Sequence, residues 1–265
     1  LEYASALDVV LAQHCEEARL AAGGQMHEGE WSSRLGVPGI PAAAEELMVQ
    51  RDISLSRLTG GRVHMLHVST AGSVALVEAA KEEGLSVTAE VAPHHLCLTE
   101  ADVCGYDPVF KVNPPLRGAS DVAAVRAGLA SGAIDAIATD HAPHTQEAKE
   151  APFDQAPPGM VGLETGLAVS LSELADELPV AAILALLSWR PARIAGLSAD
   201  HGGPVAPGAW ANLCVIDPTE TWVVDPARMA SRSRNTPFAG RQLTGRVRHT
   251  VYRGEPVVVD GEAQR

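Results

Sequence analysis

Four short apolar runs stand out in the first part of the chain, at residues 9–14, 63–68, 87–91 and 134–140. Their length is typical of buried strands. Each run ends at or near a polar or histidine residue, and each is followed by a segment with helical character. Strands that alternate with helices of this size predict a parallel sheet and an α/β fold.

The helical segments carry their apolar residues on one face. In 73–83, the side chains of Val74, Leu76, Val77 and Ala80 are expected to share a face. A second helix is expected to begin at Ser120, because a serine ahead of an apolar stripe is a common N-cap. These faces predict helices that pack against the sheet.

The pattern changes near residue 195. Helical segments at 162–177 and 180–189 give way to short β-like runs separated by Gly and Pro. We therefore predict an α/β part over 1–195 and part of a small β-subdomain over 196–265. The β-like runs are 211–216, 246–252 and 255–259.

Three residues of catalytic type lie at the C-terminal ends of predicted strands: His14, His67 and Asp140. In a (β/α)8 barrel this end of the strands carries the chemistry. Four strands cannot close such a barrel. The sequence therefore predicts the C-terminal half of a TIM-like barrel, with about four βα units and terminal helices. The chain opens at Leu1 without an initiator Met, and we expect the missing strands upstream. A complete open four-stranded domain is the alternative.

Composition excludes several classes of function. The formal net charge is −13, which argues against nucleic acid or an anionic membrane as partner. The four cysteines are widely spaced without a CxxC pair, which predicts free thiols in a reducing cytoplasm. No apolar run reaches the length of a membrane span. An anionic substrate would therefore need a local positive feature such as metal ions.

The sharpest chemical signal is the segment 138–144, which places Asp140 and two histidines after a buried run. A carboxylate there can bind a metal and move protons, and imidazole is a common zinc ligand. His64 and His67 should point to opposite sides of one strand. His67 is the better ligand candidate because it lies nearer the strand end.

Other polar positions give weaker signals. Asn113 lies in a loop made rigid by two prolines, and its amide can donate to and accept from a polar ligand. The long polar loop 145–159 can close over a site. Adjacent histidines at 94–95 are weak ligand candidates. The histidines expected to be solvated are His27, His201 and His249.

Together these strings resemble the dihydroorotase family of the metal-dependent amidohydrolase superfamily. The matching strings are His14-Cys15-Glu16-Glu17, His67-Val68-Ser69-Thr70, Pro93-His94-His95-Leu96, Lys111 to Arg117, Ile137 to His144, Gly162 to Thr165 and Asn235 to Gly240. They occur in order along nearly the whole chain. The family typically has a TIM-like barrel with a small β-sandwich subdomain.

The resemblance also implies a binuclear zinc centre. It matches His14 and His67 to ligands of one zinc, and Asp140 to a ligand of the other zinc that shuttles a proton. It matches Asn113, His144, Pro158 and Gly159 to substrate contacts. The family's HxH pair, a substrate-binding Arg and the residue that bridges the metals are absent from this sequence, so we expect this chain alone to be inactive.

The implied reaction is the reversible hydrolysis of (S)-dihydroorotate to N-carbamoyl-L-aspartate in pyrimidine (UMP) biosynthesis. One alternative is a sister cyclic amidohydrolase, a hydantoinase or allantoinase. Another is a non-catalytic dihydroorotase-like scaffold subunit of aspartate transcarbamoylase. The oligomeric state, including a homo-oligomer or a transcarbamoylase complex, stays open at this point.

Overall fold

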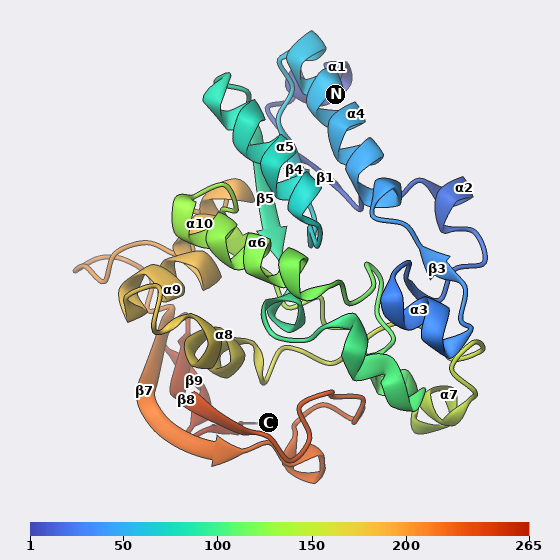
Figure 1. The fold of residues 1–265 in the computed structure, drawn as a ribbon. Coiled ribbons are helices and arrows are strands. Elements are labelled where there is room, and N and C mark those ends of the chain that lie inside the picture. Colours follow the sequence, from blue (N-terminus) through green and yellow to red (C-terminus); the bar gives the residue numbers. More distant parts are fainter. Residues whose placement is uncertain (265) are drawn as a thin grey trace.

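The computed structural model describes residues 1–264. Its central element is a four-stranded parallel sheet in the order β1-β4-β5-β6 (Figure 1). The sheet strands are β1 (Leu11–Gln13), β4 (Val63–Met65), β5 (Val87–Val91) and β6 (Ala136–Ile137). All four lie inside the predicted runs, which confirms the α/β class.

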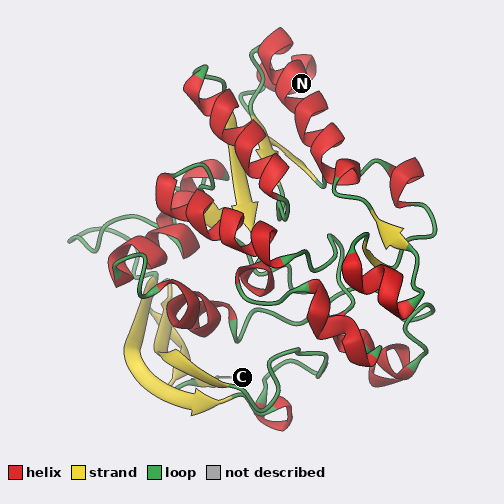
Figure 2. Ribbon diagram, in the orientation of Figure 1, coloured by secondary structure: helices red, strands yellow, loops and turns green. Residues whose placement is uncertain are grey.

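Helices cover one face of this sheet and connect its strands. Figure 2 shows the helices beside the strands, and α4, α5 and α6 pack in sequence order. The helices are α1 (Glu2–Ser5), α2 (Ala18–Ala21), α3 (Glu30–Leu35), α4 (Ala43–Thr59), α5 (Ala71–Glu82), α6 (Ala119–Ser131), α7 (Gln146–Glu150), α8 (Gly166–Leu174), α9 (Val180–Leu187) and α10 (Trp189–Ile194). Short 3-10 turns are η1 (Pro93–Leu96), η2 (Glu100–Gly105), η3 (Pro108–Phe110) and η4 (Pro226–Arg228).

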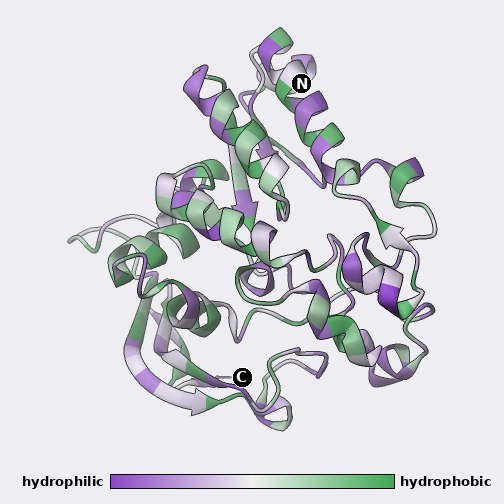
Figure 3. Ribbon diagram, in the orientation of Figure 1, coloured by the Kyte–Doolittle hydropathy of each residue, from purple (hydrophilic) through white to green (hydrophobic). Residues whose placement is uncertain are grey.

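The two faces of the sheet differ in chemistry. Along β5 the residues Val87, Ala89 and Val91 are buried with the apolar core that the helices cover. Thr88 and Glu90 alternate with them, and both bond to the imidazole of His64 on β4. The opposite face therefore carries polar groups. Figure 3 shows both hydrophobic and hydrophilic residues along β5.

Helix α6 begins two residues earlier than expected. Its N-cap is Gly118, not Ser120, which lies inside the first turn. Gly118 has an extended backbone (φ −69°, ψ 163°) and offers no side-chain cap. The prediction of the cap was wrong because a serine in the first turn gives the same sequence signal as a serine one position ahead of it.

The second sheet is antiparallel, in the order β10-β9-β8-β7. Helix α8 packs on it: Gly245 approaches Leu171 so closely that an added Cβ would clash with the leucine Cδ1. The strands are β7 (Leu213–Val223), β8 (Gln242–Tyr252), β9 (Glu255–Val259) and β10 (Glu262–Ala263). This sheet lies where the small β-subdomain was predicted, and the boundary at residue 195 stays a prediction.

A separate two-stranded parallel sheet pairs β2 (Met26–His27) with β3 (Gly39–Ile40). Both strands come between β1 and α4 in the sequence. None of the helices in residues 1–264 has the length and apolar character needed to span a bilayer.

Candidate active site

The predicted strand-end residues lie just beyond their strands. His14 directly follows β1, His67 lies two residues after β4, and Asp140 lies three residues after β6. His67 (φ +32°) and Asp140 (φ +46°) both have a left-handed backbone. For residues other than glycine this conformation costs about 1–3 kcal/mol. Neighbouring contacts must therefore hold both residues in place.

The structure brings the imidazoles of His14 and His67 together. His14 Nδ1 lies 3.0 Å from His67 Nε2, and the ring planes are nearly perpendicular at 74°. Burial lowers the pKa of His67, although the nearby Asp140 carboxylate opposes this shift. His67 is therefore held toward the neutral form, which is the form that binds metals.

His64 takes no part in this pair. It is buried against Thr88 and Glu90, with Nε2 3.0 Å from the Glu90 carboxylate. The expectation that His64 and His67 point different ways therefore agrees with their contacts. The strand itself ends at Met65, so the simple alternation of a strand does not extend to His67.

Asp140 does not complete a metal-binding group in this structure. Within residues 1–264, no three His, Cys, Asp or Glu side chains converge on a point that could hold a metal ion. The described residues therefore bring together two of the three predicted metal ligands, His14 and His67. The third, Asp140, is near enough for its carboxylate to raise the pKa of His67.

The Asn113 loop is held at its backbone and at its side chain. The His95 Nε2–H donates to the Pro114 carbonyl at 3.2 Å, and Asn113 Nδ2 donates to Glu16 Oε2 at 2.8 Å. Burial lowers the pKa of His95 to about 4, so its ring stays neutral near pH 7. His94 and His95 are both buried. His95 supports the loop, and neither histidine forms a hydrogen bond with the His14–His67 pair in the described residues.

The remaining predicted substrate contacts form a second cluster. His144 Nε2–H donates to the Pro158 carbonyl at 2.9 Å, and Gly159 N–H donates to the Lys111 carbonyl at 2.8 Å. Gly159 has φ +138°, and a Cβ there would lie 2.7 Å from His144 Nε2. The close approach of the His144 ring therefore requires glycine at position 159.

Two further features hold this cluster. Asn235 donates from Nδ2 to the carbonyls of Ala142 and Gly159 at 2.9 and 3.1 Å. Lys149, in the loop that the sequence predicts as a cover, donates to the carbonyls of Pro108 and Pro157. Burial, followed by the charge of Lys111, lowers the pKa of Lys149 to about 8. The Lys149–Pro108 bond and the Gly159–Lys111 bond attach loop 145–159 to the segment that leads into the Asn113 loop, and Asn235 holds Ala142 and Gly159 together.

The sequence and fold were compared with known proteins. The model of the amidohydrolase family matches residues 1–257. The chain belongs to the amidohydrolase family. A dihydroorotase from Pelotomaculum thermopropionicum is 54% identical over 98% of the chain, and one from Streptomyces coelicolor is 51% identical over 99%. The chain spans 61% of the length of each of these relatives.

Solved structures show the same fold. The L-hydantoinase from Arthrobacter aurescens has a TM-score of 0.88 and 28% identity, covering 100% of the chain and 60% of the hydantoinase. The dihydropyrimidinase from Brevibacillus agri has a TM-score of 0.86 and 23% identity, covering 99% of the chain and 59% of that protein. The fold of this amidohydrolase is the predicted one, part of a TIM-like barrel with a small β-subdomain.

The family implies a metal cofactor, and the histidine pair fits one. Two nitrogens bound to one tetrahedral zinc at about 2.0–2.1 Å lie about 3.3 Å apart. The nitrogens of His14 and His67 are separated by 3.0 Å. The pair can therefore serve as two ligands of a metal in this amidohydrolase.

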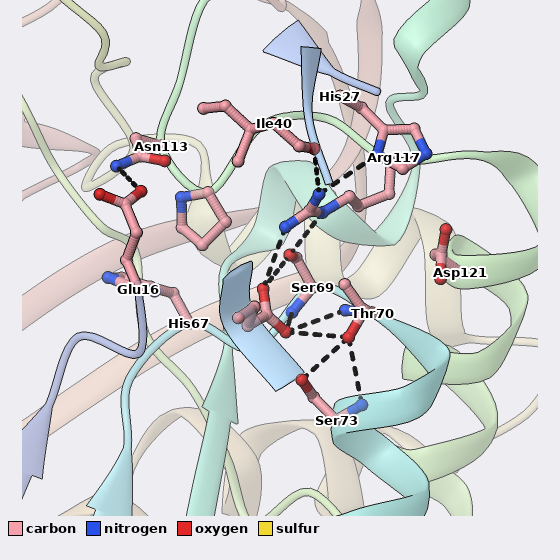
Figure 4. A network of polar contacts seen from close by, with 12 residues as sticks. Glu16, His27, Ile40, His67, Ser69, Thr70, Ser73, Asn113, Arg117 and Asp121 are labelled. Carbon is pink, nitrogen blue, oxygen red and sulfur yellow. Dashed lines mark hydrogen bonds and ion pairs between the residues drawn. The ribbon is translucent and has the colours of Figure 1, made fainter. Parts of the chain in front are cut away.

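A buried ion pair that sequence reasoning missed supports the His67 turn (Figure 4). Glu45, at the start of α4, accepts from the backbone N–H groups of Ser69 and Thr70 at 2.9 and 3.1 Å and from the Ser69 hydroxyl. Arg117 Nη2 lies 3.5 Å from the Glu45 carboxylate, and its Nε donates to Ser69 Oγ at 3.0 Å. Glu45 and Arg117 are 3% and 2% exposed, so the charges are compensated inside the protein.

This network links three loops. Arg117 ends the Asn113 loop, the Glu45 carboxylate holds the turn after His67, and Arg117 Nη1 reaches the Ile40 carbonyl and His27 Nδ1. Burial alone would raise the pKa of Glu45, but Arg117 and the bonds from Ser69 outweigh it and lower the pKa. His27, expected to be solvated, is half-buried on Arg117, and burial lowers its pKa. The sequence around Glu45 and around Arg117 contains no pattern that predicts this ion pair.

Breaking the pair from one side leaves a buried charge. We expect Arg117→Met to lower the free energy of unfolding by about 3–5 kcal/mol, the usual cost of removing one partner of a buried pair. Arg57→Met is the matched control, since Arg57 pairs with Glu83 at 2.7 Å on the surface, and should cost about 0–1 kcal/mol. Urea unfolding of the complete gene product measures both. Equal losses would contradict the role given to the Glu45–Arg117 pair.

Proposed function

We propose that the complete protein containing this chain is a dihydroorotase. It would hydrolyse (S)-dihydroorotate reversibly to N-carbamoyl-L-aspartate in pyrimidine (UMP) biosynthesis. The observation that carries the proposal is the 54% identity to a dihydroorotase over 98% of the chain. The paired imidazoles of His14 and His67 support it, because ring opening of a cyclic amide at neutral pH needs an activated water.

The proposed cofactor is zinc, two ions per intact site. His14 and His67 would hold one ion, and Asp140 would contact the other. When bound, zinc lowers the pKa of water to near neutrality and polarises a carbonyl. Asp140 would take the proton of the attacking water and deliver it to the departing ring nitrogen, which is general acid–base catalysis by one carboxyl group.

The proposed substrate contacts come from two loops. Asn113, with its free amide oxygen, would bind one side of the ring. His144 and the backbone at Pro158 and Gly159 would bind another side. The bonds from Lys149 to the Pro108 carbonyl and from Gly159 N–H to the Lys111 carbonyl support a site whose two loops are placed together. Dihydroorotate and N-carbamoyl-aspartate are the proposed small-molecule partners, and the proposed location is the cytoplasm.

Turnover on three rings separates this proposal from its nearest alternative. The complete gene product should hydrolyse dihydroorotate much faster than hydantoin or allantoin. The 28% identity to a hydantoinase is the observation that keeps the alternative open. Faster hydrolysis of hydantoin would favour it, and no hydrolysis of any ring would favour a scaffold subunit of aspartate transcarbamoylase.

A ligand complex tests the substrate contacts directly. With orotate bound to the complete protein, we expect the side chains of Asn113 and His144 within about 3.2 Å of ligand polar atoms. The physical reason is that both lie on loops beyond the C-terminal strand ends. A crystal structure with either side chain turned away from the ligand would refute its role.

A further inference from the structure

The orientation of the Asn113 amide is determined by its partner. Asn113 Nδ2 lies 2.8 Å from Glu16 Oε2, as the dashed line in Figure 4 shows. A carboxylate accepts hydrogen bonds, and of the two amide atoms only the nitrogen donates. The reverse orientation would place two acceptor oxygens against each other. Glu16 therefore turns the Asn113 oxygen away from itself.

The other amide atom, Asn113 Oδ1, has no hydrogen-bond partner in the described residues. It is also buried. A buried acceptor without a donor is costly and calls for an explanation. Asn113 also lines a small cavity together with His14, Glu16 and Pro114. A free acceptor thus lies in the neighbourhood of the proposed metal ligand His14.

The backbone of the Asn113 loop is anchored at Pro114. His95 donates to the Pro114 carbonyl at 3.2 Å, and both His95 and Pro114 are buried. Among residues 1–264, Glu16 is the only hydrogen-bond partner of the Asn113 side chain. Glu16 also lies 3.9 Å from His14 Nε2, beyond hydrogen-bond distance. Its main contact is with Asn113.

We propose that Glu16 is a positioning residue that makes Asn113 an acceptor for a ring N–H of the substrate. The inference rests on the proposed function, since a cyclic amide or ureide supplies such an N–H. Glu16 comes from the loop after β1 and Asn113 from the loop after β5, so one loop sets what the other can recognise. A site built to bond an N–H discriminates strongly against an analogue that lacks it.

Kinetics of the complete gene product test the proposal. Glu16→Met removes the acceptor at similar size and should raise KM for dihydroorotate about tenfold, the scale of one lost hydrogen bond. The value of kcat should change less than about threefold, and zinc content should stay as in the wild type. Glu16→Gln keeps an acceptor oxygen, so its KM should lie between those of the wild type and Glu16→Met. Glu17→Met is the matched control, because within residues 1–264 the Glu17 side chain hydrogen-bonds only to the backbone N–H of Arg19 in α2.

The preference between N-methylated substrates is a measurement that would not change if Glu16 had only a structural role. The wild type should reject one of the N1-methyl and N3-methyl rings by about tenfold or more, and Glu16→Met should narrow that ratio. Equal acceptance of both methylated rings by the wild type, or an unchanged ratio in Glu16→Met, would overturn the proposal. If the wild type opens hydantoin but not dihydroorotate, the proposed function fails, and the same comparison on N-methyl hydantoins still tests Glu16.

A measurement without turnover completes the test. The side-chain NH₂ signals of Asn113, assigned by their loss in Asn113→Ala, should exchange with solvent about tenfold faster in Glu16→Met. Glu17→Met should leave them unchanged. Unaltered exchange in Glu16→Met would contradict the orienting contact, whichever ring the enzyme opens.

Discussion

Replacing Asp140 with Asn should reduce dihydroorotate turnover by the complete gene product at least about 100-fold, the scale of general acid–base catalysis. The amide of the variant has nearly the same size as the carboxyl group but cannot carry the proton from water to the ring nitrogen. Asp140 lies after β6 with a left-handed backbone (φ +46°), near enough to His67 to raise its pKa.

Zinc content and turnover should be measured together. Zinc that stays bound while turnover falls assigns a proton-transfer role, whereas zinc lost in proportion to turnover assigns a ligand role. Asp176→Asn is the control, since Asp176 is exposed just after α8. Near-normal turnover in Asp140→Asn would remove Asp140 from the mechanism.

A polypeptide of only these 265 residues should have no measurable turnover and should not retain two zinc ions. Two zinc ions need at least six to eight protein and water ligands between them. The described residues bring together only the imidazoles of His14 and His67, with no converging group of three donors. Zinc is measured on purified chain of confirmed mass, beside the complete gene product. Two bound zinc ions per chain with turnover like the complete protein would contradict the assignment of ligands.

The local pattern of the sequence predicted the elements well because each is determined by nearby residues. The apolar runs predicted the four strands of the main parallel sheet, and the spacing of Val74, Leu76, Val77 and Ala80 predicted α5; the short β2–β3 pair was not predicted. The histidine pair was also predictable in part, since residues at parallel strand ends meet at one edge of a sheet. The comparisons confirm the family that the motif strings indicated.

Contacts between distant segments could not be predicted in the same way. Glu45 and Arg117 are 72 residues apart and have ordinary surface-type side chains, yet both are buried. Burial of a charge depends on the partner that the fold brings to it. Glu16 presents the same difficulty, because its contact with Asn113 spans 97 residues. Side-chain type suggests what such residues can do, and only the fold shows which partner they meet.

We propose that the protein containing this chain opens the dihydroorotate ring with zinc held partly by His14 and His67. The most direct measurement is dihydroorotate hydrolysis and zinc content of the complete gene product, before and after removal of metal by a chelator. We expect two zinc ions per chain, turnover that is lost with the metal, and turnover restored by added zinc. Full turnover by the metal-free protein, or hydrolysis of hydantoin without hydrolysis of dihydroorotate, would refute the proposal.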